Sequence, residues 1–397
     1  MLSAWAGWAP AADPGPGPAA TAVRAATEVE NLVVPPPVIG AADAARSSTG
    51  GPLPAEPAVD VGPEIVPLAD APPLPAAAGI AARTAEHGQA YVTAEAVFLQ
   101  RDDQSLIQPL AFQGDETVLA TGRMRFPTQP GLRLFVGAVN EQDAGWEVGY
   151  LGVWNMFASR TATGPDDLLG PEPLSLLVPE FNDRAAARST YAATLNSLEV
   201  NVFSRTDDGG FCRSAPQPWR RCAGYGRGTF DWLAGFRWAG LEEAAGLTFS
   251  GGANPLPGVY DLRSTSHLFG GQLGGRGRIE WERWALEGWA KAALCGSALA
   301  QSQDPIVDAA VPDPPIRPAR SAREGGVGFI GDINATLVYR LTDTWGLRAG
   351  YNLMWLSGVA LAPNQFDFGA ESTSGSGLNG GSGLFLHGAS LGLEARW

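Results

Sequence analysis

Apolar and polar side chains alternate with a period of two over the C-terminal part of the chain. In the segment 345–361 apolar residues occupy most odd positions as far as Val359 and Leu361, and small or polar residues, such as Arg348, occupy many of the even ones. The segment 385–397 repeats the pattern and ends on a tryptophan. Because successive strand residues point to opposite faces, each segment predicts a strand with one apolar face and one small or polar face.

Ten segments show this alternation. Their limits are 91–100, 132–139, 146–157, 191–204, 230–241, 259–276, 284–298, 328–341, 345–361 and 385–397. In the third of them, Met156 is predicted to share the apolar face with Trp146 and Trp154. Short turns and long loops alternate between most of the segments, and 101–130, 159–188 and 300–324 are expected to be long loops.

This organisation is typical of an antiparallel transmembrane β-barrel, which presents apolar residues to lipid and polar residues to its lumen. We therefore predict an all-β fold, a barrel of 10 to 12 strands over residues 89–397. The higher count applies if a further hairpin lies within 101–130 or 243–258. The loop 365–383 is expected to be flexible and extracellular, and the sequence does not decide whether it folds into the lumen.

Residues 1–88 have a different character. They are dominated by Ala, Pro and Gly and show no persistent period, so we expect a disordered leader before the barrel. The first residues lack the basic and apolar regions of a secretory signal peptide. For an exported protein this indicates that the start is misassigned or that the sequence is truncated.

The composition excludes further classes of protein. Charged residues are 17% of the 397, Gly 51 and Trp 13 are numerous, and the net charge of −14 excludes a general nucleic-acid binder. No apolar run of about 18 residues occurs, so a transmembrane helix is excluded.

Cys212 and Cys222 lie in one Gly/Pro/Arg loop, where a disulfide would fit an oxidising compartment.

Charged residues on the inward faces are the candidate functional residues. They are Glu147, Glu199, Arg237, Glu287, Lys291, Asp332, Arg340, Arg348, Glu394 and Arg396. Rings of charge set ion selectivity in a channel, which favours a porin-like passive channel for ions or small solutes. The alternative is that these charges pair across a narrow, filled lumen, because a barrel of about eight strands is just filled by its side chains. The protein would then be a structural surface barrel whose loops bind partner proteins or form part of the envelope.

An enzyme is not expected. His87, His267 and His387 are the histidines of the chain, and none has a nucleophile beside it on the same strand face. The sequence contains no GxSxG, HExxH or CxxC motif, and no ligand spacing indicates a metal or cofactor.

Several segments resemble one family. AEAVFLQ, YAATLNSLEVNVF, WLAGFRW, GGQLGGRGRIEWERW and LRAGYNLMWLSGVALAPNQF, with the terminal strand, resemble the BBP7 family of planctomycete outer-membrane β-barrel proteins. The resemblance covers residues 89–397 and implies a barrel in a bacterial outer membrane, without catalytic residues. The expected partners are outer-membrane lipid and the barrel-assembly machinery, which would engage the terminal strand ending at Trp397.

Overall fold

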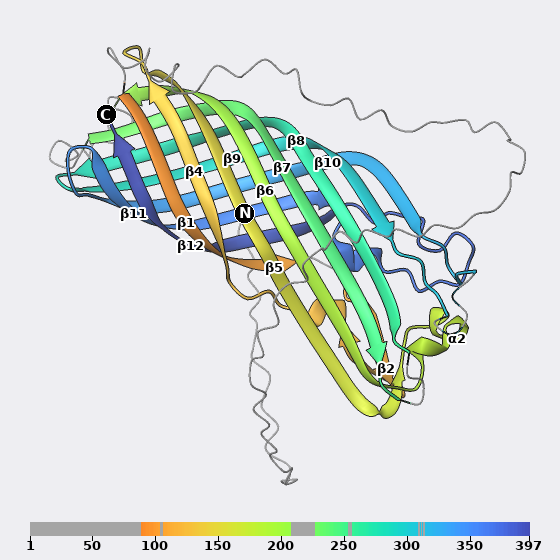
Figure 1. The fold of residues 1–397 in the computed structure, drawn as a ribbon. Helices are drawn as coiled ribbons and strands as arrows, with labels where there is room; N and C mark the ends of the chain where they lie inside the picture. Colours follow the sequence, from red (N-terminus) through yellow and green to blue (C-terminus); the bar gives the residue numbers. More distant parts are fainter. Residues whose placement is uncertain are drawn as a thin grey trace, which may run out of the picture. The chain divides into compact units, whose positions relative to one another are not determined.

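Ten long antiparallel strands form a closed barrel in the computed structural model, which describes residues 89–397 except 104–105, 208–226, 253–255, 309, 311 and 313. They are β1 (Gln89–Asp103), β4 (Gln129–Val139), β5 (Ala144–Leu169), β6 (Arg184–Asp207), β7 (Arg227–Ser250), β8 (Gly258–Trp281), β9 (Trp284–Gln303), β10 (Arg320–Arg340), β11 (Trp345–Val359) and β12 (Ser382–Arg396) (Figure 1). Each strand pairs with its neighbours in the ring, and pairing of β1 with β12 closes it. The predicted fold class is confirmed.

Two further strands lie outside the ring. β2 (Pro109–Gln113) and β3 (Glu116–Ala120) form a hairpin that joins the sheet through β5, where Phe112 pairs with Leu169. A hairpin within 101–130 was therefore correctly anticipated, although it does not enlarge the barrel. The described part of the segment 243–258 holds no hairpin, since β7 continues as far as Ser250 and β8 begins at Gly258.

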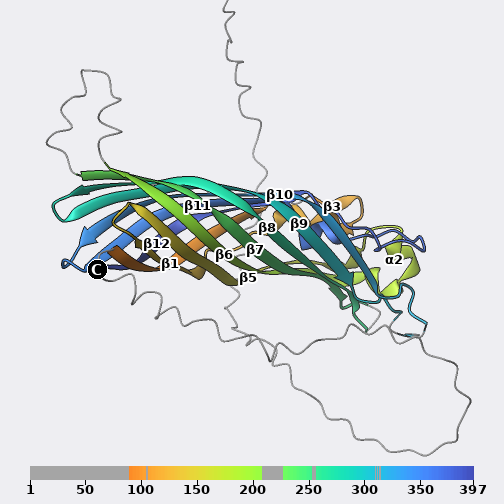
Figure 2. The same ribbon diagram turned by 90° about the horizontal axis from the view of Figure 1, so that it is seen from above.

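The short turns β4–β5, β8–β9 and β10–β11 lie at one end of the barrel, and the connections that follow β1, β5, β7, β9 and β11 lie at the other. The ends of β6 and β7 that residues 208–226 connect also lie at the short-turn end. The ends of β1 and β12 near Gln89 and Trp397 lie beside the short turns β4–β5, β8–β9 and β10–β11, and helix α2 (Leu174–Leu177) lies at the other end (Figure 2). The other short helices are η1 (Thr121–Arg123), η2 (Pro179–Phe181) and η4 (Ala362–Gln365). No helix in the described part of the chain is long and apolar enough to cross a membrane.

The central strands extend further than the alternation predicted. Much of the expected loop 159–188 is strand, with Thr163 of β5 paired to Ala186 of β6. The outward side chains of this part are largely polar, such as the exposed Thr161 and Arg188, which pair with each other. The apolar face that marks a strand in the sequence is therefore lost here, although the backbone pairing continues. The prediction of a loop here was wrong for that reason.

Two irregularities turn side chains to the opposite face. Asn155 has a φ of 57°, and the β5–β6 register shifts around it, so that Met156 points inward and is 1% exposed. Gly358 has a φ of 76° at a shift in the β11–β12 register, and beyond it Val359 and Leu361 are fully buried. Predicting these three apolar residues on the outer face was wrong, because one extra residue reverses the alternation.

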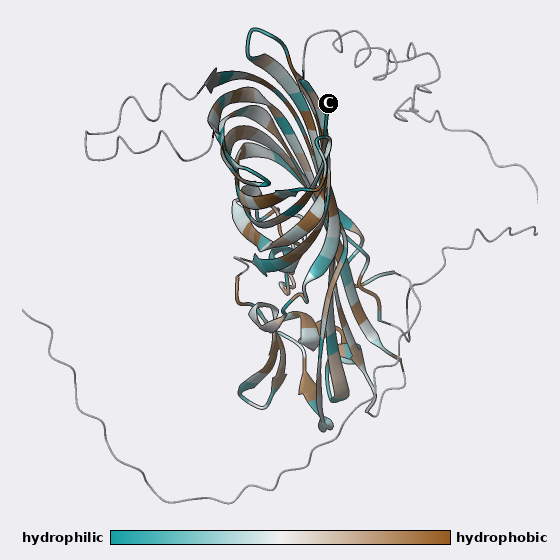
Figure 3. Ribbon diagram, turned by 90° about the vertical axis from the view of Figure 1, so that its left-hand side faces the viewer, coloured by the Kyte–Doolittle hydropathy of each residue, from teal (hydrophilic) through white to brown (hydrophobic). Residues whose placement is uncertain are grey.

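Hydrophobic and hydrophilic residues alternate along the strands of the barrel (Figure 3). The outward side chains next to the short-turn end are largely apolar and form a broad band. Its large exposed side chains include Val202, Trp232, Leu273, Leu294 and Val327, which are 63 to 75% exposed. Aromatic residues border both edges: Trp281, Trp284, Trp345 and Trp397 lie near the short turns, and Trp154, Trp238, Phe269 and Trp355 lie further along the strands. The tilted part of β9 from Trp284 to Leu294 rises roughly 25 Å, the height of an outer-membrane apolar band.

Candidate functional site in the barrel interior

The inward face of the barrel gathers most of the predicted charged residues. Eight of the ten are buried with at most 5% exposure: Glu147, Glu199, Arg237, Glu287, Lys291, Asp332, Arg348 and Glu394. The side chains of Arg340 and Arg396 are 43% and 20% exposed at the short-turn rim. Arg340 pairs there with Glu280 at 3.0 Å. The strands thus place the eight buried charges inside the barrel and these two at its mouth.

The buried charges form three layers of paired side chains at successive depths in the lumen. The layer nearest the short turns is organised around Arg348 of β11. Its guanidinium donates through Nε to Glu95 at 2.7 Å, through Nη1 to Glu394 at 2.7 Å and through Nη2 to Glu287 at 2.9 Å. Arg278 of β8 binds Glu287 and Glu394 as well, each at 2.9 Å. Carboxylates from three strands and guanidinium groups from two others therefore share one cross-linked network.

Lys291 of β9 holds the next layer together. Its Nζ lies 3.3 Å from Glu147 of β5 and 3.0 Å from Glu199 of β6, so it spans the lumen. Arg276 of β8 pairs with Glu147 and, at 2.8 Å, with Asp231. The Tyr91 hydroxyl donates to Glu147 at 2.6 Å.

A third layer centres on Asp332 of β10. Arg237 of β7 donates to it at 3.0 Å, and the indole Nε1 of Trp289 donates to it at 3.3 Å. Arg133 of β4 lies 3.7 Å from the same carboxylate, donates to Asn352 and covers the Trp289 ring at 5.4 Å from its centroid. The three layers together link strands from around the whole ring through ion pairs across the lumen.

Sequence reasoning missed several members of this network. Glu95, Arg133, Asp231, Arg276 and Arg278 have the same structural role as the predicted residues. For the first four of them, a position in phase with the inward faces of the expected strands was the signal that could have found them. Arg278 lies just beyond the expected segment 259–276. Tyr91 lay at the start of a predicted strand, but nothing in the pattern assigned its hydroxyl to a carboxylate.

Beyond the charged layers the lumen is filled by apolar side chains and by an inward-folded segment. Residues 360–366, which follow β11 and include η4, are all buried. The N–H groups of Ala360 and Ala362 donate to Ser266 Oγ at 2.9 Å and to Glu243 at 2.7 Å. Gln303 donates to the carbonyl of Gln365 at 2.9 Å. The start of the loop that was expected to be flexible is thus fixed to the inner wall, and we call residues 360–366 the plug segment.

Little space remains between these groups. A cavity of about 10 Å³ lies among the charged layers, bordered by residues such as Phe135, Trp289 and Lys291. That volume is about what a single water molecule needs. The charged layers are therefore a packed ionic core across the lumen.

The remaining candidate residues take no part in this core. His267 stacks on Trp238 on the outer face, and His387 exchanges a 2.7 Å hydrogen bond with the Tyr351 hydroxyl. Cys212, Cys222 and His87 lie outside the described residues. Within the described ranges, no group of three or more His, Cys, Asp or Glu side chains is arranged to hold a metal ion.

Comparison with known proteins finds likeness in solved structures alone. No family model and no curated protein sequence matches the chain. A major outer membrane protein from Thermus thermophilus matches with 10% identity and a TM-score of 0.30, over 78% of this chain and 99% of that one. A Pseudomonas aeruginosa FadL homologue matches with 8% identity and a TM-score of 0.22, over 79% and 90%. The P. putida toluene transporter TodX matches with 9% identity and a TM-score of 0.17, over the same shares.

TM-scores this low do not establish a shared architecture. The likeness therefore says nothing about what this protein binds or transports.

Proposed function

We propose that the protein is a bacterial outer-membrane β-barrel with a closed lumen, which serves as a structural element of the cell envelope. Its apolar outer band with aromatic borders suits a bilayer, and its closed ring leaves the backbone of the band satisfied. The resemblance to the BBP7 barrels agrees with this location. No catalytic role is part of the proposal.

The packed interior is the observation that carries the structural role. Arg348, Lys291 and Asp332 each bind partners from other strands, and the plug segment blocks the lumen beyond them. Breaking such buried pairs leaves uncompensated charge, which costs several kcal/mol for each pair. A passive channel, the first expectation from the sequence, would require all these groups to move aside together.

The proposed partners follow from the proposed location in the outer membrane. Lipid covers the apolar band, and the exposed Trp397 ends the strand that closes the barrel against β1, with its carbonyl accepting from Ala90 N–H at 2.9 Å. We propose that the assembly machinery engages this terminal strand before closure. The long connections at the other end are then the part of the described chain that is available to partners outside the cell.

Single-channel recording tests the proposal. The full-length protein, refolded and inserted in planar bilayers, is expected to give no stable conductance steps. Insertion is verified independently by the faster migration of unheated barrel on a denaturing gel. Stable steps from folded protein would contradict a closed lumen. If Lys291→Glu also changed their ion selectivity, the channel would be assigned to the barrel axis.

A further inference from the structure

The barrel wall has a gap between β10 and β11 at the end far from the short turns. Pairing of these two strands stops at Phe329 and Ser357, although β10 continues back to Arg320 and stays paired with β9 on its other edge. After Val359, which still pairs with Ser382 of β12, the chain leaves the wall and enters the lumen as the plug segment. Among the described residues, nothing completes the ladder along the free edge of residues 320–328.

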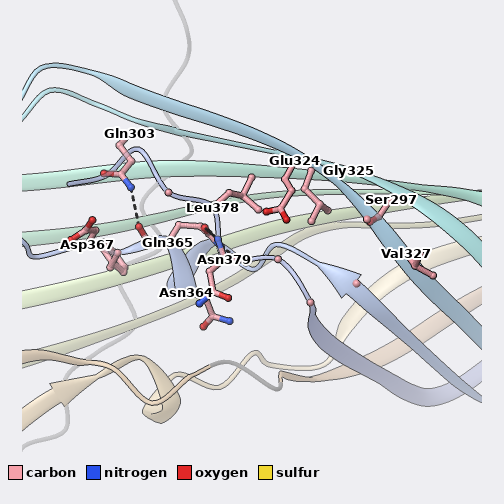
Figure 4. Close-up of a pocket in the computed structure, with 17 residues that line it drawn as sticks. Ser297, Gln303, Glu324, Gly325, Val327, Asn364, Gln365, Asp367, Leu378 and Asn379 are labelled. Atoms are coloured by element: carbon pink, nitrogen blue, oxygen red, sulfur yellow. Dashed lines mark hydrogen bonds between the residues drawn. The ribbon is translucent and has the colours of Figure 1, made fainter. Parts of the chain in front are cut away.

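A cavity of about 600 Å³ lies behind this free edge (Figure 4). It is bordered on one side by Glu324, Gly326 and Val327 of β10, and on the other by Phe366 and Leu378 from the connection between β11 and β12. Ligand sites for small molecules have volumes of roughly 300 to 1,000 Å³. The cavity is thus large enough for a small molecule, and the gap gives it a mouth in the side of the barrel.

The mouth lies at the edge of the apolar band that is far from the short turns. Val327 at the free edge is 75% exposed on the outer face. Just below it, Phe329 and Trp355 lie with ring centroids 6.1 Å apart and belong to the aromatic border. In the proposed outer-membrane placement, the mouth therefore faces the outer-leaflet interface, where amphiphiles have their polar heads.

The charge of the residues that line the cavity indicates which charge a bound head group should carry. Glu324 and Asp367 are its acidic residues, and the lining contains no Lys, Arg or His. The Asp367 carboxylate already accepts the N–H groups of Gly369 at 2.8 Å and Gly375 at 2.7 Å. Glu324 makes neither a hydrogen bond nor an ion pair within the described part of the chain, and Figure 4 shows its carboxylate among the cavity side chains.

We propose that this side opening is a binding site for a cationic amphiphile, a role that rests on the proposed membrane location. The ammonium head lies at Glu324, where backbone carbonyls of the free strand edge supply further acceptors. The apolar chain packs against Leu299, Leu378 and Val327. An anionic amphiphile is disfavoured because two carboxylates border the cavity, while Arg317 lies behind the lining with its guanidinium bound to the Asp367 carbonyl at 2.8 Å.

Native mass spectrometry of the full-length protein with three amphiphiles of equal chain length tests the site. The probes are decylammonium, whose head carries N–H donors, decyl sulfate and decyl glucoside, each added at the same concentration below its micellar limit. We expect a one-to-one adduct with the cationic probe at about tenfold lower concentration than with decyl sulfate. Equal binding of all three probes would overturn the proposal.

Three variants locate the adduct. Gly326→Trp fills the cavity, since a Cβ at this glycine lies 3.0 Å from Ser297 Oγ inside it, and it should abolish the adduct. Glu324→Gln should weaken cationic binding roughly two- to fivefold and leave decyl glucoside unchanged. Gly271→Trp, on the exposed outer face of β8, where an added Cβ meets open space, is the matched control and should bind like the wild type.

The result separates this inference from the proposed function. A folded, bilayer-inserted barrel without a preferred cationic adduct would overturn the binding site and leave the closed-barrel proposal intact. Preserved binding in Gly326→Trp would overturn the assignment to this cavity. Failure of the folded protein to enter bilayers would contradict the membrane location, on which both proposals depend.

Discussion

Arg348 binds Glu95, Glu287 and Glu394, which come from three different strands, and its side chain is only 2% exposed. Arg340 lies on the adjoining strand, but its side chain is 43% exposed and pairs with Glu280 alone. Both arginines were predicted to face inward. Because Arg348 is more buried and has more partners, it should contribute more than Arg340 to the free energy of unfolding.

The variant Arg348→Met should reduce the free energy of unfolding by about 3–5 kcal/mol, because it leaves the buried Glu95 without its cation and removes one of the cations that Glu287 and Glu394 share with Arg278. The measurement is a denaturant titration of the barrel in lipid vesicles. Arg340→Met is the control, and its loss should stay below about 1 kcal/mol, as expected for an exposed pair. Equal losses in the two variants would contradict the buried network.

At the scale of single elements, the plug segment shows how a loop becomes part of the core. Its N–H groups are satisfied by Ser266 and Glu243 on the inner wall, and its residues Leu361 and Phe366 join the apolar cluster of the barrel. Glu243 also pairs with Arg101 and accepts from the Tyr191 hydroxyl at 2.9 Å. One carboxylate therefore connects the segment to two strands of the wall.

Replacing Glu243 with Ala should loosen the plug segment. A hydrogen bond to a charged group is worth roughly 1.5–3 kcal/mol, so the Ala362 amide should exchange with deuterium at least about tenfold faster. Hydrogen exchange of a peptide covering residues 358–368 measures this. Glu242→Ala, one position along on the exposed outer face, should leave the rate unchanged. Unchanged protection in Glu243→Ala would show that the anchor lies elsewhere.

At the scale of the whole molecule, the surface and the interior are inverted relative to a water-soluble domain. Large apolar residues such as Leu273 and Leu294 are 69% and 70% exposed, while Arg237 and Arg348 are 2% exposed. In the proposed outer-membrane location, lipid covers this outer band. Substitutions at single outward positions should then have measurable energetic costs.

Leu273→Arg should reduce the free energy of unfolding from a bilayer by about 2–4 kcal/mol, the cost of an arginine near the middle of the lipid layer. Thr265→Arg, on the outward face of the same strand beyond the aromatic border, should cost less than about 1 kcal/mol. Reversible folding into vesicles of both variants gives the comparison. Similar values at the two positions would contradict the placement of the band in lipid.

The period of two was enough to predict the barrel and the inward side of each strand. That side is a local property, because every second residue of a regular strand faces the same way. Hence Glu147, Lys291 and Arg348 could be placed inside before any partner was known. Local reasoning failed at Asn155 and Gly358, where an irregularity reverses the alternation, and along the outer parts of β5 and β6, where polar side chains face water.

The tertiary structure decided what the interior does. Whether Lys291 meets Glu147 and Glu199, or is separated from them by water, depends on the tilt and stagger of strands far apart in sequence. The inward path of the plug segment and the gap beside β10 likewise follow from hydrogen bonds and register across the ring. The sequence by itself determined a barrel with a charged inner face, because side-chain alternation is local. Only the closed ring determined that these charges pair and fill the lumen, because their partners come from opposite sides of the barrel.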